Sequence, residues 1–144
     1  MKIEDQPGCK PQRVCIVDDR AAARCVLEGL VRTMVPPVAV ESFCNPRFAL
    51  EQMQHDIPDL IITDYSMPGM NGIELIRQVR ATPELADVPI VLITASQELP
   101  IFHEAMESGA TDFILRPIDP GKCCARWTDL LARRRTQKNA STLA

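Results

Sequence analysis

Acidic side chains directly follow two short apolar runs of the chain. Asp18 and Asp19 follow residues 14–17, and Asp64 follows residues 60–63. Carboxylates that lie close together raise one another's pKa unless a cation lies among them. Mg²⁺ is the small, hard ion that suits one or two carboxylates together with a carbonyl and waters. The types and positions of these acids therefore predict a magnesium site, provided that the fold brings them together.

Two further apolar runs end in a hydroxyl and a cation. Thr94 ends the run at residues 90–94, and Arg116 follows the run at residues 112–115. At a phosphoryl group, a metal ion and a guanidinium neutralise the oxygens, a hydroxyl donates a hydrogen bond, and a carboxylate can attack the phosphorus. Together with the acids, Thr94 and Arg116 therefore indicate a site that handles a phosphoryl group.

The apolar runs before these side chains predict the strands of a parallel sheet. They are rich in Val and Ile and end in a polar residue, which is typical of central strands buried on both faces. Strands and helical patterns alternate five times, so we expect an α/β fold of the type (βα)5 with helices on both faces. The expected strands are residues 14–17, 38–43, 60–64, 90–94 and 112–115.

The strand order follows from the need to cover both faces of this five-stranded sheet. Right-handed crossovers achieve this only if the order reverses somewhere. In the common flavodoxin-like, doubly wound order 2-1-3-4-5, the reversal falls between the first and third strands, whose ends carry Asp18, Asp19 and Asp64. These carboxylates would then share one crevice at the edge where such sheets bind ligands. The second strand is more polar and is expected near an edge of the sheet.

Local signals place the helices between the strands. Asn45 and Pro46 predict a helix start, and Gly109 is typical of the left-handed residue that follows a helix end. The expected helices cover about residues 20–34, 46–55, 73–79, 100–108 and 120–135.

Length and composition predict a single globular domain. The chain has 144 residues, of which 46% are hydrophobic and 24% are charged, so it can bury a core without disulfides or a structural metal. We expect a flexible leader at residues 1–12, the domain at residues 13–135, and a flexible tail or the start of a linker at residues 136–144. No apolar run approaches the roughly 18 residues needed to span a bilayer, so we expect a cytoplasmic protein without a membrane partner.

Cysteine spacing and charge argue against several classes of site. The six cysteines form no CxxC motif and no Cys/His ligand pattern, so we interpret them as reduced thiols and not as a zinc or redox site. The net charge of −3 argues against nucleic-acid binding by this domain. We interpret the basic run at residues 133–135, with Lys138, as a last helical turn that complements the helix dipole. No glycine-rich loop follows the first strand, so no nucleotide cofactor is expected.

The motifs together resemble the receiver domain of two-component response regulators over residues 13–135. The matching residues, in order, are Val17-Asp18-Asp19, the loop from Asp64 to Gly72, Thr94-Ala95, Phe113 and Arg116-Pro117. The resemblance implies a phosphorylation switch in which Asp64 takes a phosphoryl group from a sensor histidine kinase or a histidine phosphotransfer protein.

The resemblance also implies one set of residues for the metal ion and another for the switch. The ligands of Mg²⁺ would be three carboxylates and one backbone carbonyl, namely Asp18, Asp19, Asp64 and Ser66. Thr94 would donate to a phosphoryl oxygen and draw the following loop inward, after which Phe113 would become buried. This movement would reshape the face made by the fourth helix, fifth strand and fifth helix, where an output domain, a partner protein or a second copy of the chain would bind.

Arg116 stands where this family normally has lysine. Arginine keeps the charge but is longer and planar, and it prefers two-pronged contacts, so the exchange is not neutral at a phosphate site. Three outcomes stay open: Arg116 makes a bidentate phosphoryl contact, it points away, or it pairs permanently with the acids and weakens switching. We expect Asp64 to be phosphorylated with Mg²⁺ and the switch to be altered.

Two other classes of function stay open, as does the output. One is a receiver-like module that binds partners independently of phosphorylation, an alternative that Arg116 in place of lysine keeps open. A magnesium-dependent phosphohydrolase with an aspartyl-phosphate would need a second carboxylate two residues after Asp64, but Ser66 occupies that position, so we expect no enzymatic activity from this domain. Residues 119–135 and the loop after Asp64 are similar to receivers fused to cyclic-di-GMP phosphodiesterase domains, while a DNA-binding or other output remains an alternative.

Overall fold

A sheet of five parallel strands forms the centre of the computed structural model, which describes residues 10–95 and 99–143. The strands are β1 (Arg13–Val17), β2 (Ala39–Phe43), β3 (Leu60–Asp64), β4 (Ile90–Thr94) and β5 (Asp112–Leu115). Their order is β2-β1-β3-β4-β5, which confirms the predicted flavodoxin-like topology. β3 and β4 are buried throughout, whereas the more polar β2 lies at an edge, as predicted.

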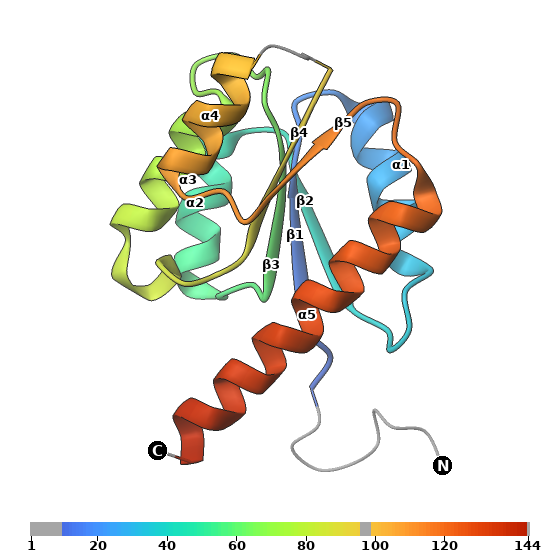
Figure 1. The fold of residues 1–144 in the computed structure, drawn as a ribbon, viewed down its shortest axis with the longest axis vertical. Helices are drawn as coiled ribbons and strands as arrows, with labels where there is room; N and C mark the ends of the chain where they lie inside the picture. The colour runs from blue at the N-terminus through green and yellow to red at the C-terminus, as the bar shows by residue number, and fades with distance from the viewer. Residues whose placement is uncertain (1–9, 96–98, 144) are drawn as a thin grey trace.

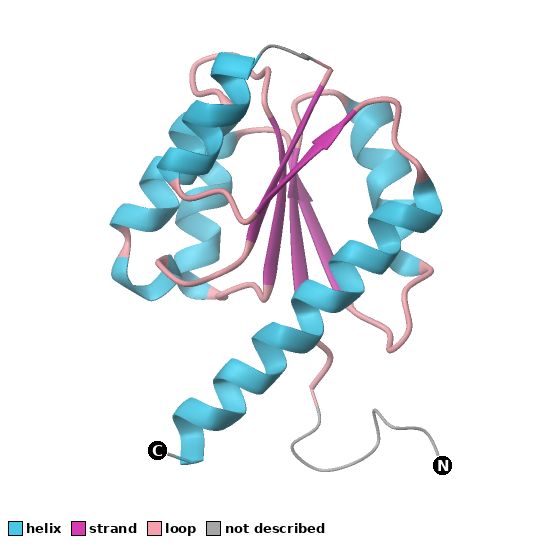
Figure 2. Cartoon of the chain, viewed as in Figure 1, coloured by secondary structure: helices cyan, strands magenta, loops and turns pink. Residues whose placement is uncertain are grey.

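Helices cover both faces of this sheet (Figure 1, Figure 2). They are α1 (Ala21–Arg32), α2 (Pro46–His55), α3 (Gly72–Ala81), α4 (Leu99–Ser108) and α5 (Pro120–Leu143), and a short 3-10 helix, η2 (Pro83–Leu85), precedes β4. The apolar side chains of α2, α3 and α4 pack in one core cluster, and those of α1 and α5 pack in another. Among the helices of residues 10–95 and 99–143, none combines the length and apolar character that a bilayer span requires.

Alternation along the strands supplies both core clusters. On β1, Cys15 and Val17 face the cluster with α2, α3 and α4, while Val14 and Ile16 face the cluster with α1 and α5. Because successive strand residues point to opposite faces, a strand covered on both sides must be apolar at every position. This explains why the runs that end in chemically active residues carry so few polar side chains.

Capping residues fix the predicted helix boundaries. The side chain of Asn45 accepts hydrogen bonds from the backbone N–H groups of Arg47 and Phe48, which confirms the predicted start of α2. Gly109 follows α4 with a φ of 111°, a conformation that favours glycine, as predicted.

The last helix is longer than predicted. α5 continues to Leu143, so the prediction of a helix end at Arg135 is wrong, and the predicted tail or start of a linker at residues 136–144 is helical up to Leu143. The apolar periodicity stops near Leu131, but the following residues include neither glycine nor proline, and most are good helix formers. In Figure 1, this part of α5 extends beyond the sheet toward the C-terminus.

A buried carboxylate holds the extended part of α5. Asp59, just before β3, is buried and lies 3.7 Å from Nε of Arg134 and 3.3 Å from Nζ of Lys138. Its other oxygen accepts a hydrogen bond of 2.9 Å from the backbone N–H of Arg13, at the start of β1. The prediction of a cationic last turn at residues 133–135 is therefore wrong, because Arg134 is buried in an ion pair in the middle of the helix.

Loss of Arg134 is expected to destabilise the protein far more than loss of its neighbour Arg133. Arg134→Gln removes a partner of the buried Asp59 carboxylate, so we expect the free energy of unfolding to fall by about 2 kcal/mol. Arg133→Gln breaks only an exposed pair with Asp129 and should cost less than about 0.5 kcal/mol. Urea denaturation followed by the fluorescence of the buried Trp127 measures both values. Equal losses for the two variants would contradict this account of α5.

Candidate functional site

Three carboxylates converge at one end of the sheet. The register pairs Val17 with Thr63, so the residues that follow them, Asp18 and Asp64, are neighbours. One oxygen each from Asp18, Asp19 and Asp64 lies within 4.8 Å of the others. Asp18 and Asp64 are buried and Asp19 is half-buried. The strand order thus brings together the acids that the sequence placed at this edge.

Close packing fixes the backbone around Asp64. A Cβ atom on Gly72, the first residue of α3, would lie 2.4 Å from the carbonyl oxygen of Asp64 and 2.5 Å from Leu92 Cδ1, so only glycine fits there. The Gly72 N–H donates to the carbonyl of Tyr65 over 2.8 Å. The Thr63 hydroxyl donates to the carbonyl of Asp64 over 3.0 Å. The Asp64 side chain therefore projects from a closely packed strand end.

Arg116 pairs with two of the acids. Its Nη2 donates to Asp64 Oδ1 over 3.1 Å and to Asp18 Oδ2 over 3.2 Å. One nitrogen thus makes both contacts, while the buried Nε of Arg116 has no hydrogen-bond partner among the described residues. The side chain of Arg116 therefore does not point away from the acids, whereas its permanent pairing with them and a bidentate contact with a phosphoryl group both stay predictions.

Arg20 is a second cation at the site, and the sequence analysis missed it. Its Nε lies 3.6 Å from Asp18 Oδ1 and its Nη2 lies 3.7 Å from Asp64 Oδ1. The side chain is 56% exposed, so it reaches the acids from the solvent side. Sequence reasoning placed Arg20 at the start of a helix, but its position directly after two acids at the ligand-binding edge was a usable signal.

Burial dominates the electrostatics of Asp64. Removal from water raises the pKa of its carboxyl, and the nearby Asp18 raises it further. The hydrogen bond and charge of Arg116 and the charge of Arg20 oppose this rise without cancelling it. Asp64 is thus a carboxylate whose ionised form is costly in this structure.

Two of the three acids line one cleft together with the hydroxyl and the two cations, whereas Asp18 is fully buried behind them. The volume of the cleft is about 510 Å³, enough for a phosphoryl group with its surrounding ligands. Thr94 lies in its wall at the end of β4 and is buried. The other lining residues that the sequence singled out are Asp19, Asp64, Ser66 and Arg116. Residues 96–98 of the loop after Ala95 lie outside the described part of the chain. The predicted inward movement of this loop therefore stays a prediction.

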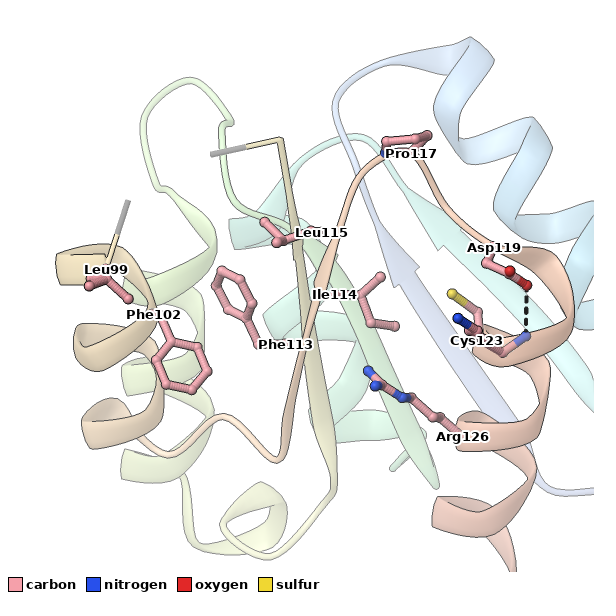
Figure 3. A pocket seen from close by; sticks show the side chains of 10 residues that line it. Leu99, Phe102, Phe113, Ile114, Leu115, Pro117, Asp119, Cys123 and Arg126 are labelled. Carbon is pink, nitrogen blue, oxygen red and sulfur yellow. Dashed lines mark hydrogen bonds between the residues drawn. The ribbon is translucent and has the colours of Figure 1, made fainter. Parts of the chain in front are cut away.

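Phe113 lies in a second cavity and not in the cleft. It is half-buried on β5, and its ring meets Phe102 of α4 edge to face, with centroids 5.3 Å apart (Figure 3). The cavity between α4, β5 and α5 has a volume of about 430 Å³ and includes Leu99, Leu115 and Arg126 in its lining. Phe113 therefore occupies the face where the sequence placed the output of the switch.

Comparison with known proteins identifies one family. The profile of the response regulator receiver domain matches residues 14–128. RpfG of Xanthomonas campestris pv. campestris (strain 8004), a cyclic di-GMP phosphodiesterase response regulator, is 37% identical over 131 residues, which cover 91% of this chain and 35% of RpfG. The two-component response regulator ORR8 of Oryza sativa subsp. indica is 35% identical over 106 residues, which cover 73% of this chain and 86% of ORR8.

A solved structure of a chemotaxis protein has the same fold as this chain. The chemotaxis protein CheY4 of Vibrio cholerae superposes with a TM-score of 0.77 at 26% identity, over 84% of this chain and 99% of CheY4. The chain spans about a third of the length of RpfG, so the activity in the name of RpfG belongs to a longer protein. These matches favour the receiver function over a phosphohydrolase or a phosphorylation-independent module.

Replacing Asp64 with asparagine is expected to stabilise the protein in the absence of divalent cations. Because the pKa of the carboxyl is raised, the folded state binds this proton more tightly than the unfolded state does. The cost of the ionised group is therefore present above the folded-state pKa and disappears below the unfolded-state pKa. Asparagine removes that cost, so we expect the free energy of unfolding at neutral pH to rise by about 1 kcal/mol.

Urea denaturation over a range of pH checks this expectation. The gain from Asp64→Asn should shrink as the pH falls toward the unfolded-state pKa of an aspartate, near 4. The matched control Asp56→Asn changes an exposed acid and should leave stability nearly unchanged at each pH. A loss of stability in Asp64→Asn at neutral pH would show that the ion pairs outweigh the cost of burial.

Proposed function

This chain belongs to the family of response regulator receiver domains, and we propose that Asp64 is the residue that accepts its phosphoryl group. Receiver domains of two-component systems take phosphate from histidine kinases and act on output domains. The observation that supports this assignment is the position of Asp64 on a closely packed strand end, inside a cleft that also presents a hydroxyl and a guanidinium. We place the protein in the cytoplasm, where kinases of this kind transfer their phosphoryl groups.

The proposed transfer uses the carboxylate of Asp64 as the nucleophile. Its oxygen attacks the phosphorus of a phosphohistidine, a P–O bond forms as the P–N bond breaks, and the electron pair returns to the imidazole nitrogen. Arg116 and Thr94 line the same cleft and are the groups that would stabilise charge on the phosphoryl oxygens. Because the pKa of Asp64 is raised, the reactive ionised fraction should fall as the pH is lowered.

Receiver domains generally bind Mg²⁺ at an acidic pocket, and we assign that role here to Asp18, Asp19, Asp64 and the backbone carbonyl of Ser66. The donor set fits the ion, because all of these ligands offer the oxygen atoms that Mg²⁺ prefers. Oδ1 of Asp19 is buried and has no hydrogen-bond partner among the described residues, which suits a ligand atom. When bound, the ion would neutralise the carboxylates and polarise the phosphoryl group.

The proposed output passes from Thr94 to Phe113. Thr94 ends β4 beside the cleft, and Phe113 lies on the neighbouring strand in the cavity between α4, β5 and α5. A hydrogen bond from Thr94 to the phosphoryl group would pull the β4–α4 loop inward and leave space for Phe113 to turn toward the core. We propose this α4-β5-α5 face as the surface for an output domain, a partner protein or a second copy of the chain.

An output related to cyclic di-GMP is the first one to test. RpfG, which matches 91% of this chain, is a cyclic di-GMP phosphodiesterase response regulator. The extended α5 leaves the sheet as a continuous helix and would connect the receiver to such a domain as a linker.

Phosphorylation of Asp64 is tested with acetyl phosphate as the small-molecule donor. We expect intact-mass spectrometry to show one added phosphoryl group in the presence of Mg²⁺ and almost none after the ion is chelated. Asp64→Asn should abolish the gain, because the nucleophile is gone, whereas the exposed control Asp56→Asn should keep it. A mass gain that survives in Asp64→Asn would assign the acceptor to another residue.

Arg116→Lys is expected to weaken the switch without preventing phosphorylation. In this structure a single nitrogen of Arg116 contacts both acids, and a lysine Nζ can do the same. Only the guanidinium offers a second prong to a phosphoryl oxygen, so its loss should lower the coupling between phosphorylation and the α4-β5-α5 face by about 1 kcal/mol.

Amide hydrogen exchange in α4 and β5, with and without acetyl phosphate, measures this coupling. The control Arg32→Lys makes the same exchange at an exposed position on α1, where Arg32 pairs with Glu28, and should leave the coupling as in the wild type. If Arg116→Lys shows the same phosphorylation-dependent protection as the wild type, arginine has no special role in this switch.

A further inference from the structure

Arg20 stands between the solvent and the acids that would hold a metal ion. Its Nε and Nη2 lie 3.6 Å and 3.7 Å from oxygens of Asp18 and Asp64, so one guanidinium spans two of the three carboxylates. These distances are those of ion pairs and are too long for strong hydrogen bonds. The side chain is therefore attracted to the acids but not locked to them.

The two arginines at this site differ in how firmly they are held. Arg116 is 21% exposed and donates hydrogen bonds of 3.1 Å and 3.2 Å, whereas Arg20 is 56% exposed. The backbone N–H of Arg20 also donates to Asp18 Oδ1 over 2.9 Å, and this bond does not depend on its side chain. The guanidinium of Arg20 can thus leave the acids for solvent while the chain at this position stays in place.

The charges at the site explain why the Arg20 guanidinium would have to leave when a metal ion binds. The guanidinium groups of Arg20 and Arg116 pair with Asp18 and Asp64, whereas Asp19 has no ion pair among the described residues. A third guanidinium, that of Arg24, donates to the backbone carbonyl of Asp18 over 2.8 Å. A divalent cation placed among the same oxygens adds two positive charges and would repel both arginines at short range. Since Arg116 is held by hydrogen bonds, the exposed Arg20 is the one that yields.

We propose that Arg20 is an internal competitor of the divalent cation, one that pairs with Asp18 and Asp64 before the metal binds and withdraws to solvent when it does. The proposal rests on the metal-binding role assigned above to these acids. It follows from linkage that any free energy with which Arg20 pairs with the acids is subtracted from the metal affinity. The receiver would then hold its metal more weakly than one without a cation at this position.

Direct measurement of metal binding tests the proposal without reference to phosphorylation. The probe is Mn²⁺, whose free concentration is read by electron paramagnetic resonance, with Mg²⁺ added in competition. We expect Arg20→Gln to bind Mn²⁺ about tenfold more tightly than the wild type, which is within the usual range of coupling between sites. Arg20→Lys keeps the charge but cannot span both carboxylates, so its affinity should fall between the two.

Arg32→Gln is the matched control, because it removes the same charge from the helix that begins directly after Arg20. Arg32 pairs with Glu28 on the surface of α1, away from the three acids, and its loss should change the affinity less than about twofold. If Arg20→Gln and Arg32→Gln shift the affinity equally, the effect is one of net charge and the competition is refuted. Weaker binding by Arg20→Gln would also refute it.

A different result would refute the metal site itself. If neither the wild type nor any variant binds Mn²⁺ or Mg²⁺, the assignment of the acids to a metal ion fails. Unchanged affinity in Arg20→Gln, with clear binding by the wild type, would leave the metal site standing and remove only the competitor. The two failures are thus distinguished by the wild-type titration alone.

Discussion

The close approach of three carboxylates is the constraint on which the rest of the site depends. Asp18 and Asp64 are buried, and burial of unpaired charge is costly, so the fold must supply positive groups around them. It does so from three directions: the backbone N–H of Arg20, the guanidinium of Arg20 and the guanidinium of Arg116. These groups reduce the cost only in part, because the pKa of Asp64 stays raised. A cation bound among the three carboxylates, as proposed, would reduce the remaining cost.

The opposite end of the sheet solves a similar problem in a different way. Asp59 is also a buried carboxylate beside β1 and β3, and it is paired with Arg134 and Lys138 of α5. There both cations come from α5, and their ion pairs with Asp59 hold this helix against the sheet. At the carboxyl end Asp19 and Asp64 line a cleft of about 510 Å³, which leaves room for a ligand. Burial of an acid therefore indicates function only together with an accessible cleft.

The sequence predicted the strands, their order and the convergence of the acids because each depends on local patterns. Apolar runs with polar ends define the strands, and the need to cover both faces of the sheet fixes their order. The length of α5 was missed because its apolar periodicity stops near Leu131, and the ion pairs that hold the helix further on, Asp59 with Arg134 and Lys138, join residues far apart in the sequence. The contact of Arg20 with the acids was missed because Arg20 was assigned only to the start of a helix. A residue at that position also belongs to the loop that carries Asp18 and Asp19.

The replacement of lysine by Arg116 acquires a physical meaning from the contacts in the structure. A single nitrogen, Nη2, contacts both Asp18 and Asp64, so the unphosphorylated state uses arginine only as a point charge. The buried Nε has no partner among the described residues, and an unpaired buried donor is unfavourable. A phosphoryl group on Asp64 would bring acceptor oxygens into reach of the unused side of the guanidinium. If Asp64 accepts the phosphoryl group as proposed, Arg116 would gain a hydrogen-bond partner on phosphorylation, which would move the balance of the switch toward the phosphorylated state without any change in its acceptor.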